Sequence, residues 1–277
     1  MADGAPARPY RGPLRAAIFD WAGTTVDYGS RAPAGVFIDV FKRRAVPITV
    51  EQARGPMGMH KRDHIAALLA LPSVTAMWRE LHGRPPGDTD VQSMFEELVP
   101  LQLACLRDYA DVIPGTIEAV DACRRRGMKI GSTTGYNRPM IELLLGEAKR
   151  RGYEPDCAVC VDDVPAGRPH PYMALRAAIL LESYPMEAIV KVGDTAQDIY
   201  EGLNAGMWTV AVAKTGNEIG LSEAEVAALP ADELAARLAH AYERLRAAGA
   251  HEVIDGAGDL PAALDAIEAR LANGERP

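Results

Sequence analysis

The chain has 277 residues, of which 30 are Lys or Arg and 38 are Asp or Glu, so its formal net charge at pH 7 is −8. This acidic balance argues against a nucleic-acid or membrane partner, since either would require a basic face. Four cysteines are too few for a disulfide scaffold, and no apolar run reaches the roughly 18–20 residues that span a bilayer. With 48% apolar and 25% charged residues, the composition is typical of a globular protein, and we expect a cytoplasmic enzyme of about two domains.

The first hundred residues contain one strand pattern followed only by helical patterns. Residues 1–13 are rich in Ala, Pro, Gly and Arg and lack the apolar segment of a signal peptide, so we expect a flexible leader. A short apolar run over 15–19 predicts a buried strand ending at Asp20, and a loop follows over 21–29. Helices are then expected at about 34–44, 61–70, 74–81 and 89–109.

From residue 115 onward, helical and strand patterns alternate. Strands are expected at 128–134, 157–161, 188–192 and 208–212, and helices at 115–126, 137–151, 171–181 and 198–205. Such alternation is typical of βαβ units, in which a parallel sheet carries helices on both faces. We therefore predict an α/β core made of residues 14–28 and 110–277, interrupted by an all-helical cap domain over residues 29–109.

Polar side chains gather at the carboxyl ends of the predicted strands, where an open parallel sheet binds its ligands. Asp20, Thr134 and Asp194 end three strands, Arg168 follows another, and Asp198 comes four residues after Asp194. Carboxylates beside a hydroxyl and a cation suit a hard metal ion such as Mg²⁺ together with a phosphoryl group. Asp20 can bind that metal and attack phosphorus, while Thr134 and Arg168 hold the phosphoryl oxygens.

These residues carry a family resemblance. Asp20-Trp-Ala-Gly-Thr24, Thr134, Arg168 and Gly193-Asp194 resemble, in order and spacing, the four motifs of the haloacid dehalogenase superfamily. The resemblance implies a Rossmann-like parallel sheet with an inserted cap. Phosphatases of that superfamily usually carry a second Asp two residues after the nucleophile, where it protonates the leaving oxygen; here that position is Ala22. Alanine cannot protonate a leaving group, which disfavours a simple phosphate ester as substrate.

Further segments resemble the phosphonoacetaldehyde hydrolase family within this superfamily, over nearly the whole chain after the leader. They are residues 20–29, Met57-Gly58 with Lys61 and His64, 132–136, and 163–169. The resemblance implies a Mg²⁺ ion held by Asp20, the main-chain carbonyl of Ala22 and Asp194. It also implies that Lys61 forms a Schiff base with a small phosphonate aldehyde, and that the enzyme is a homodimer with contacts through the cap.

The implied reaction explains why a proton donor is missing. A carbon leaving group departs as a carbanion and needs an electron sink, which an iminium on Lys61 provides. Asp20 then takes the phosphoryl group, and water releases phosphate and acetaldehyde. Lys61 must be neutral to attack, and burial or a nearby positive charge lowers the pKa of a lysine; Arg62, Arg54 and the charge at the metal site are the candidates.

The cap residues near Lys61 complete the expected site. His64 lies one helical turn from Lys61 and is a candidate proton carrier, although a structural role fits it as well. Met57 and Gly58 are expected to contact the substrate. Without the resemblance, a lone lysine at a helix start would be interpreted as a solvated surface charge.

Other residues have competing interpretations. Asp198 either supports the metal through a bound water or caps its own helix, and Asp27 and Asp163 are expected to be loop or capping residues. Cys157-Ala-Val-Cys160 has the C-x-x-C spacing of redox and zinc sites. On a strand, however, those two side chains point to opposite faces, so we expect structural cysteines.

Two other functions stay open at this point. A phosphomonoesterase or phosphosugar mutase of the same fold would hydrolyse or transfer simple phosphate esters, which Ala22 disfavours. A catalytically silent module would bind a phosphorylated metabolite with Mg²⁺ and release no phosphate, which the loss of the second Asp would fit. Phosphate release from phosphonoacetaldehyde distinguishes the three functions.

Overall fold

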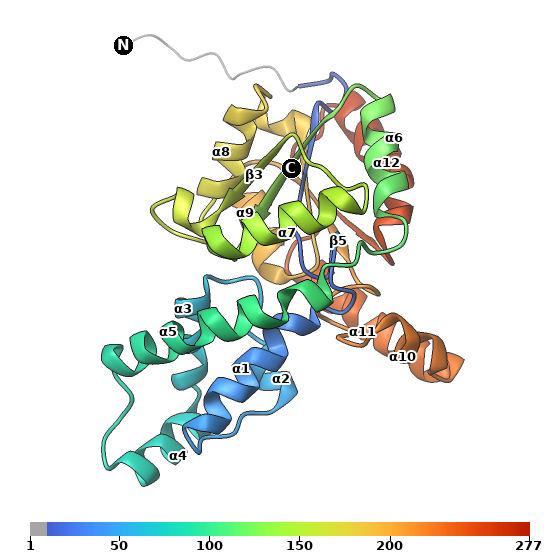
Figure 1. Cartoon of the computed structure of the whole chain (residues 1–277). Helices are drawn as coiled ribbons and strands as arrows, with labels where there is room; N and C mark the ends of the chain where they lie inside the picture. The colour runs from blue at the N-terminus through green and yellow to red at the C-terminus, as the bar shows by residue number, and fades with distance from the viewer. Residues whose placement is uncertain (1–9) are drawn as a thin grey trace.

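The structure, a computed structural model, describes residues 10–277. Its centre is a six-stranded parallel sheet with the strand order β3-β2-β1-β4-β5-β6 (Figure 1). The strands are β1 (Ala16–Phe19), β2 (Lys129–Thr134), β3 (Cys157–Cys160), β4 (Ile189–Gly193), β5 (Trp208–Val212) and β6 (Glu252–Ile254). The predicted α/β fold is confirmed, and the first five strands lie within one residue of their expected ends. The sixth strand is not predicted, because three residues are too few to show a pattern.

Helices cover both faces of the sheet. On one face lie α6 (Thr116–Arg125), α7 (Arg138–Arg150) and α12 (Leu260–Ala272). On the other lie α8 (Tyr172–Leu180), α9 (Ala196–Asn204) and α11 (Ala231–Ala247), with α10 (Glu223–Ala228) packed beside them. In β1, Ala17 and Phe19 face the first layer, and Ala16 and Ile18 face the second. Burial on both faces explains why this strand is a continuous apolar run.

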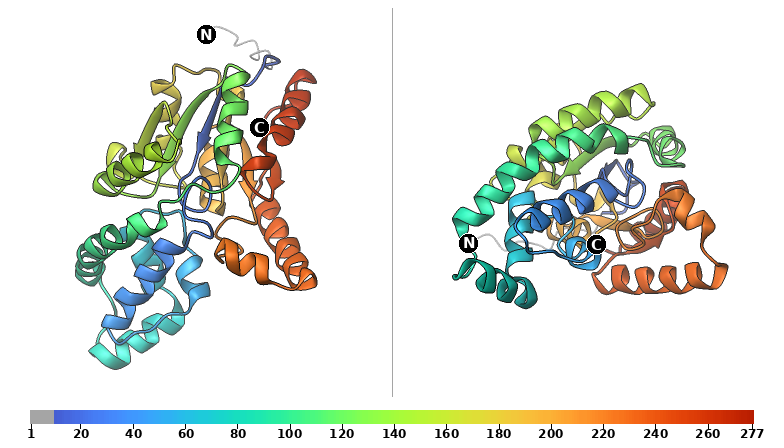
Figure 2. Two further views of the ribbon diagram at one scale, coloured as in Figure 1. Left: turned by 45° about the vertical axis from the view of Figure 1, so that its right-hand side comes forward. Right: turned by 60° about the horizontal axis from the view of Figure 1, so that its bottom comes forward.

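Between β1 and α6 the chain forms a helical cap, seen in blue to green below the sheet in Figure 1 and again in Figure 2. Its helices are α1 (Arg31–Arg43), α2 (Val50–Arg54), α3 (Lys61–Leu69), α4 (Pro72–His82) and α5 (Asp88–Cys105). Short 3-10 turns lie at Leu106–Tyr109, Val161–Asp163, Met186–Ala188 and Ala257–Asp259. The helical insertion is as expected, except that the five-residue α2 is not predicted. The domain limits at 28/29 and 109/110 stay predictions.

The strand order places the cap over a crevice. The chain leaves β1 and β4, which are neighbours, toward opposite edges of the sheet, so the loops at their carboxyl ends diverge. The cap is inserted in the loop after β1 and therefore stands over this opening. Gly29 lies in the linker with a φ of +83°, and a Cβ there would come within 2.3 Å of the Leu221 carbonyl oxygen. Only glycine lets the linker pass so close to the core.

The predicted leader, residues 1–13, lies mostly outside the described residues. In its described part, the Tyr10 hydroxyl donates a hydrogen bond to the Pro13 carbonyl oxygen at 2.7 Å. The Arg11 guanidinium donates to the Ala272 carbonyl oxygen at 3.4 Å, so this stretch contacts the end of α12. Across residues 10–277, no helix has the length and apolar character needed to cross a membrane.

Candidate active site

A pocket lies where the cap meets the carboxyl ends of the central strands. The predicted site residues that line it are Asp20, Ala22, Met57, Gly58, Lys61, Thr134, Arg168 and Asp194. His64 and Asp198 are outside this lining. Tertiary structure thus brings the cap amine and the strand-end carboxylates, which the sequence separates, to one place.

Three buried carboxylates converge at the base of the pocket. Asp20, Asp194 and Asp198 each offer an oxygen, and these oxygens lie within 4.8 Å of one another. Burial raises the pKa of Asp20 and raises that of Asp194 well above its usual value, where the charge of Asp20 adds to the effect. A cluster of carboxylate oxygens that repel one another is the donor set of a hard divalent cation, so these residues fit a metal ion.

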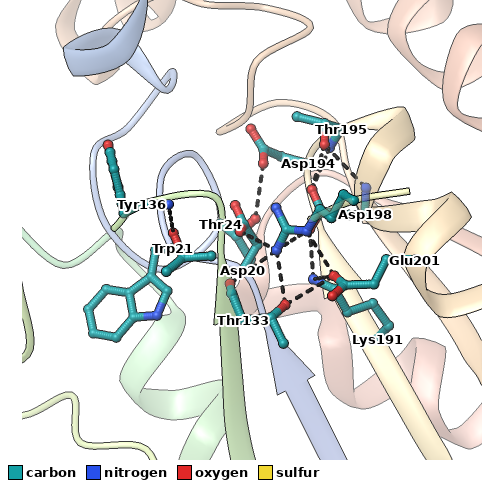
Figure 3. Close-up of polar contacts among 12 residues, drawn as sticks. Asp20, Trp21, Thr24, Thr133, Tyr136, Lys191, Asp194, Thr195, Asp198 and Glu201 are labelled. Carbon is teal, nitrogen blue, oxygen red and sulfur yellow. Dashed lines mark hydrogen bonds and ion pairs between the residues drawn. The ribbon is translucent and has the colours of Figure 1, made fainter. Parts of the chain in front are cut away.

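Arg168 is held beside the carboxylates by buried acceptors, and three residues that supply them, Asp20, Thr133 and Glu201, are labelled in Figure 3. Its Nε donates to Glu201 Oε2 at 2.8 Å, and its NH2 donates to Asp20 Oδ1 at 2.7 Å and to the Thr133 carbonyl oxygen at 3.0 Å. Burial alone would lower the pKa of Arg168, but Asp198, Asp20 and Glu201 raise it well above its usual value. Within residues 10–277, NH1 makes no hydrogen bond, which leaves it available for a phosphoryl oxygen.

Asp198 has the capping role that the sequence allowed and also contacts the carboxylate cluster. Its Oδ2 accepts the Thr195 backbone N–H at 3.3 Å in a capping box at the start of α9, and also accepts the Thr195 hydroxyl at 2.6 Å. Its Oδ1 lies 2.7 Å from Lys191 Nζ and 3.0 Å from Arg168 NH2. Burial would raise the pKa of Asp198, but Arg168 and Lys191 lower it on balance.

The charges in this buried cluster do not balance by themselves. Two cations pair with three of the four carboxylates, and Asp194 has no ion-pair partner among residues 10–277, so the cluster would attract a divalent cation. The carboxylates are Asp20, Asp194, Asp198 and Glu201, and the cations are Arg168 and Lys191.

Lys61 begins α3 and lines the same pocket as the carboxylates Asp20 and Asp194. The residue is only 5% exposed, and Nζ lies 4.9 Å from the Tyr136 ring centroid and 5.5 Å from that of Phe37. Burial lowers the pKa of Lys61 from 10.5 to about 8, against the opposing attraction of Asp20. At pH 7 this lowering increases the neutral fraction of the amine about 300-fold.

The cations considered for tuning Lys61 are engaged elsewhere. Arg62 pairs with Asp88 inside the cap, and Arg54 donates to core carbonyl groups. Arg168 is the cation whose charge adds to burial in lowering the pKa of Lys61. The effect of Arg168 on the pKa of Lys61 could not be read from the sequence, because Arg168 lies more than a hundred residues further along the chain.

His64 packs behind Lys61, outside the pocket lining. Its Nε2 lies 2.9 Å from the Ala53 carbonyl oxygen and donates to it, and its ring lies against Phe37 with centroids 3.8 Å apart. Burial lowers the pKa of His64 to about 3, and the charge of Lys61 adds to this, so the ring is neutral. Nδ1 is buried without a hydrogen-bond partner among the described residues. These contacts fit the structural alternative, and the proton-carrier role stays a prediction.

The Met57-Gly58-Met59 segment of the cap packs closely against the core. Gly58 has a φ of +89°, and a Cβ there would lie 2.5 Å from Thr195 Oγ1. A Cβ at Gly135 on the core side would lie 2.8 Å from the Met59 carbonyl oxygen. Glycine is therefore required at 135 by the nearby cap backbone, and at 58 by the positive φ together with the Thr195 side chain.

The loop aspartates and strand cysteines have the structural roles expected of them. Asp27 accepts two backbone N–H groups at the start of α1, each at 3.0 Å, and Asp163 accepts the Cys160 N–H at 2.9 Å. Cys157 and Cys160 are free and pack into the cores on opposite faces of the sheet. The C-x-x-C spacing is therefore a feature of the strand and not a redox or zinc site.

Comparison with known proteins agrees with this site. Residues 14–206 match the family model described as haloacid dehalogenase-like hydrolase. The chain is 51% identical over 270 residues to a phosphonoacetaldehyde hydrolase of Syntrophobacter fumaroxidans, covering 98% of both chains. It is 50% identical over 270 residues to one of Nitratidesulfovibrio vulgaris, covering 98% of this chain and 96% of the relative. The chain belongs to the phosphonoacetaldehyde hydrolase family of haloacid dehalogenase-like hydrolases.

The similarity to a solved structure of the family extends over 99% of the chain. The crystal structure of a phosphonoacetaldehyde hydrolase-like protein from Oleispira antarctica matches with a TM-score of 0.96 and 39% identity, covering 99% of both chains. This similarity includes the cap as well as the sheet. The resemblance drawn from the motifs is thereby confirmed, and the chain is a hydrolase.

Several residues of the site are missed by motif reasoning. Lys191 and Glu201 are buried and hold Asp198 and Arg168, and Tyr136 lines the pocket with a hydroxyl that has no hydrogen-bond partner among residues 10–277. Lys191 leaves one signal in the sequence, since a lysine inside an apolar strand requires a buried acidic partner. Its partners cannot be read from the sequence, because they come from the next helix.

Proposed function

We propose that this chain hydrolyses the carbon–phosphorus bond of phosphonoacetaldehyde to give acetaldehyde and phosphate. The observation that supports this is a single pocket holding the amine of Lys61 and the carboxylate of Asp20, with Ala22 at the position of the usual proton donor. An amine opposite a carboxylate suits a small substrate with an aldehyde at one end and a phosphoryl group at the other. Relatives that bear this enzyme name support the substrate.

The first step is attack of neutral Lys61 Nζ on the aldehyde carbon. The adduct takes up one proton at its hydroxyl and loses water, which leaves a protonated imine that carries the positive charge. The rings of Tyr136 and Phe37 near Nζ stabilise that cation by cation–π attraction. Burial of Lys61 favours this step, because it supplies neutral amine near pH 7.

In the second step the carbon–phosphorus bond breaks. Its electron pair moves into the iminium and forms an enamine, while an Asp20 oxygen bonds to phosphorus and forms an aspartyl-phosphate. Arg168 NH1 and Thr134 face the same pocket and hold the phosphoryl oxygens. The enamine carbon is protonated, water hydrolyses the imine to acetaldehyde and free Lys61, and water also hydrolyses the aspartyl-phosphate. The net reaction consumes one water molecule.

We propose Mg²⁺ as the metal ion of this site. Asp20, Asp194 and the main-chain carbonyl of Ala22 would hold it, with Asp198 close to the same oxygens. When bound, the ion offsets the negative charge between Asp20 and the phosphoryl group, so that the carboxylate can approach phosphorus.

We also propose that the enzyme is cytoplasmic and forms a homodimer through the cap, as the family resemblance implies. The four cysteines are free, which suits a reducing compartment. Val50 and Leu81 on cap helices α2 and α4 are 49% and 52% exposed, and are candidates for the interface. Leu81→Glu is expected to convert dimers to monomers in sedimentation analysis; an unchanged dimer would contradict the role of this residue.

The function is tested by supplying phosphonoacetaldehyde and Mg²⁺ and measuring phosphate and acetaldehyde. Equal amounts of both are expected, and borohydride added with substrate should inactivate the enzyme and label Lys61. Asp20→Asn should release no phosphate but still be labelled, because imine formation precedes phosphoryl transfer. Exposed Lys42, on α1, provides a matched control as Lys42→Met, which should retain activity and labelling.

Three results would contradict the proposal in different ways. Full turnover without a label on Lys61 would exclude the imine. Phosphate release from simple phosphomonoesters alone would indicate a phosphatase. Binding of Mg²⁺ and phosphate with no release from any substrate would indicate a catalytically silent module.

A further inference from the structure

Arg54, near the end of α2, extends from the cap into the core. Its NH1 donates to the Gly29 carbonyl oxygen at 2.9 Å and to Asn217 Oδ1 at 3.1 Å, and its NH2 donates to the Gly220 carbonyl oxygen at 2.8 Å. One guanidinium therefore joins the cap, the linker that enters the cap, and the core loop after β5. Its donors are arranged in a planar fork, so several acceptors in fixed places define its position.

The core side of this contact is shaped to receive the arginine. Gly220 has a φ of +68°, and a Cβ there would lie 2.6 Å from Arg54 Cζ, so a side chain at position 220 would displace the guanidinium. Asn217 also returns a hydrogen bond, because its Nδ2 donates to the Arg54 carbonyl oxygen at 3.4 Å. The side chain and the backbone of Arg54 are thus both held by one core residue.

Asn217 at the same time holds a carboxylate of the candidate metal site. Its backbone N–H donates to Asp194 Oδ2 at 2.8 Å, whereas the other Asp194 oxygen receives, among residues 10–277, only a longer bond of 3.4 Å from Thr24 Oγ1. The same loop is tight against this side chain, since a Cβ at Gly216 would lie 2.5 Å from the Asp194 Cβ. A shift of the loop must therefore move Asp194.

We infer that Arg54 is a positioning residue that couples the seating of the cap to metal binding, through Asn217 and Asp194. When the cap lifts, Arg54 leaves its carbonyl acceptors, and the loop that carries Asn217 loses its link to the cap. Such coupling is reciprocal: the metal ion favours the seated cap, and the seated cap favours the metal ion. The inference rests on the proposed function, in which Lys61 on the cap must meet a phosphoryl group beside the metal.

The test uses Arg54→Gln, with Arg62→Gln as matched control, because Arg62 pairs with Asp88 within the cap. Two quantities are measured without substrate: the Kd for Mg²⁺ by calorimetry, and amide hydrogen exchange over residues 50–69 with and without Mg²⁺. In the unmodified protein and in the control, Mg²⁺ should slow exchange in this segment. In Arg54→Gln the Kd should rise about 5- to 50-fold, and Mg²⁺ should no longer slow exchange.

Asn217→Ala separates coupling from folding. It removes the side-chain contacts with Arg54 but keeps the backbone N–H that binds Asp194, so a weaker Mg²⁺ affinity must arise through Arg54. The Mg²⁺ affinity of the double variant should equal that of Arg54→Gln. If Arg54→Gln does not fold, Asn217→Ala alone decides the test.

The inference is overturned if Arg54→Gln, or Asn217→Ala where the first does not fold, binds Mg²⁺ as tightly as the control. It is also overturned if Mg²⁺ slows exchange equally in all the proteins. These measurements need no turnover. A protein that shows the coupling but releases no phosphate from phosphonoacetaldehyde would refute the proposed function and leave the inference standing.

Discussion

Replacing Lys61 with methionine should abolish activity and make the protein more stable at pH 7. Methionine has a similar length, keeps the contacts of the aliphatic stem and carries no charge. In the native protein, burial lowers the pKa of Lys61 from 10.5 to about 8, so the folded state must bury a protonated amine at pH 7. Burying this amine for catalysis is thus expected to lower the free energy of unfolding.

The size of the expected stabilisation follows from the pKa of Lys61. The unfolded chain keeps this proton up to about pH 10.5 and the folded chain releases it near pH 8, so folding below pH 8 is penalised by about 3 kcal/mol. Lys61→Met should therefore gain up to about 3 kcal/mol at pH 7, which raises Tm by up to about 8 °C.

The assay is thermal unfolding at pH 7 and at pH 10, with Lys42→Met on exposed α1 as the control. The increase in the free energy of unfolding of Lys61→Met over wild type should be complete below about pH 8. It should shrink between pH 8 and 10.5, because the Lys61 amine of the folded wild type becomes neutral there. A variant less stable than wild type at pH 7, or a gain of equal size at pH 10, would refute the reasoning.

Three further predictions concern the same pocket. If neutral Lys61 attacks as proposed, kcat/KM for phosphonoacetaldehyde should rise about tenfold per pH unit below about pH 8 and then level off; a flat profile from pH 6 to 9 contradicts this. Ala22→Asp should not increase phosphonoacetaldehyde turnover in a phosphate-release assay, because no leaving oxygen needs a proton; a faster enzyme would oppose the imine mechanism. Glu201→Gln removes the charge that holds Arg168, so it should lower the free energy of unfolding in urea by about 3 kcal/mol and raise KM. The control Glu233→Gln, at an exposed residue, should lower it by under about 1 kcal/mol. Equal losses in the two variants would refute the role of Glu201.

The sequence was informative wherever the signal is local. A strand buried on both faces is an apolar run, as in Ala16–Phe19, and helix periodicity found the longer cap helices. Short elements such as α2 and β6 carry too few residues to show a period and are missed. Motif order placed Asp20 and Asp194 at strand ends because parallel strands end at one edge of the sheet.

What the sequence by itself determined is the α/β fold with a helical insertion and the family, and it singled out Asp20 and Lys61 as the candidate reacting groups. Only the tertiary structure decided that Lys61 is buried and shares a pocket with Asp20, that His64 lies outside this lining, and that Arg54 binds the loop that holds Asp194. The reason is physical. Periodicity and motifs report how a residue relates to its own strand or helix, whereas burial, pKa and hydrogen-bond partners depend on segments far away in the chain.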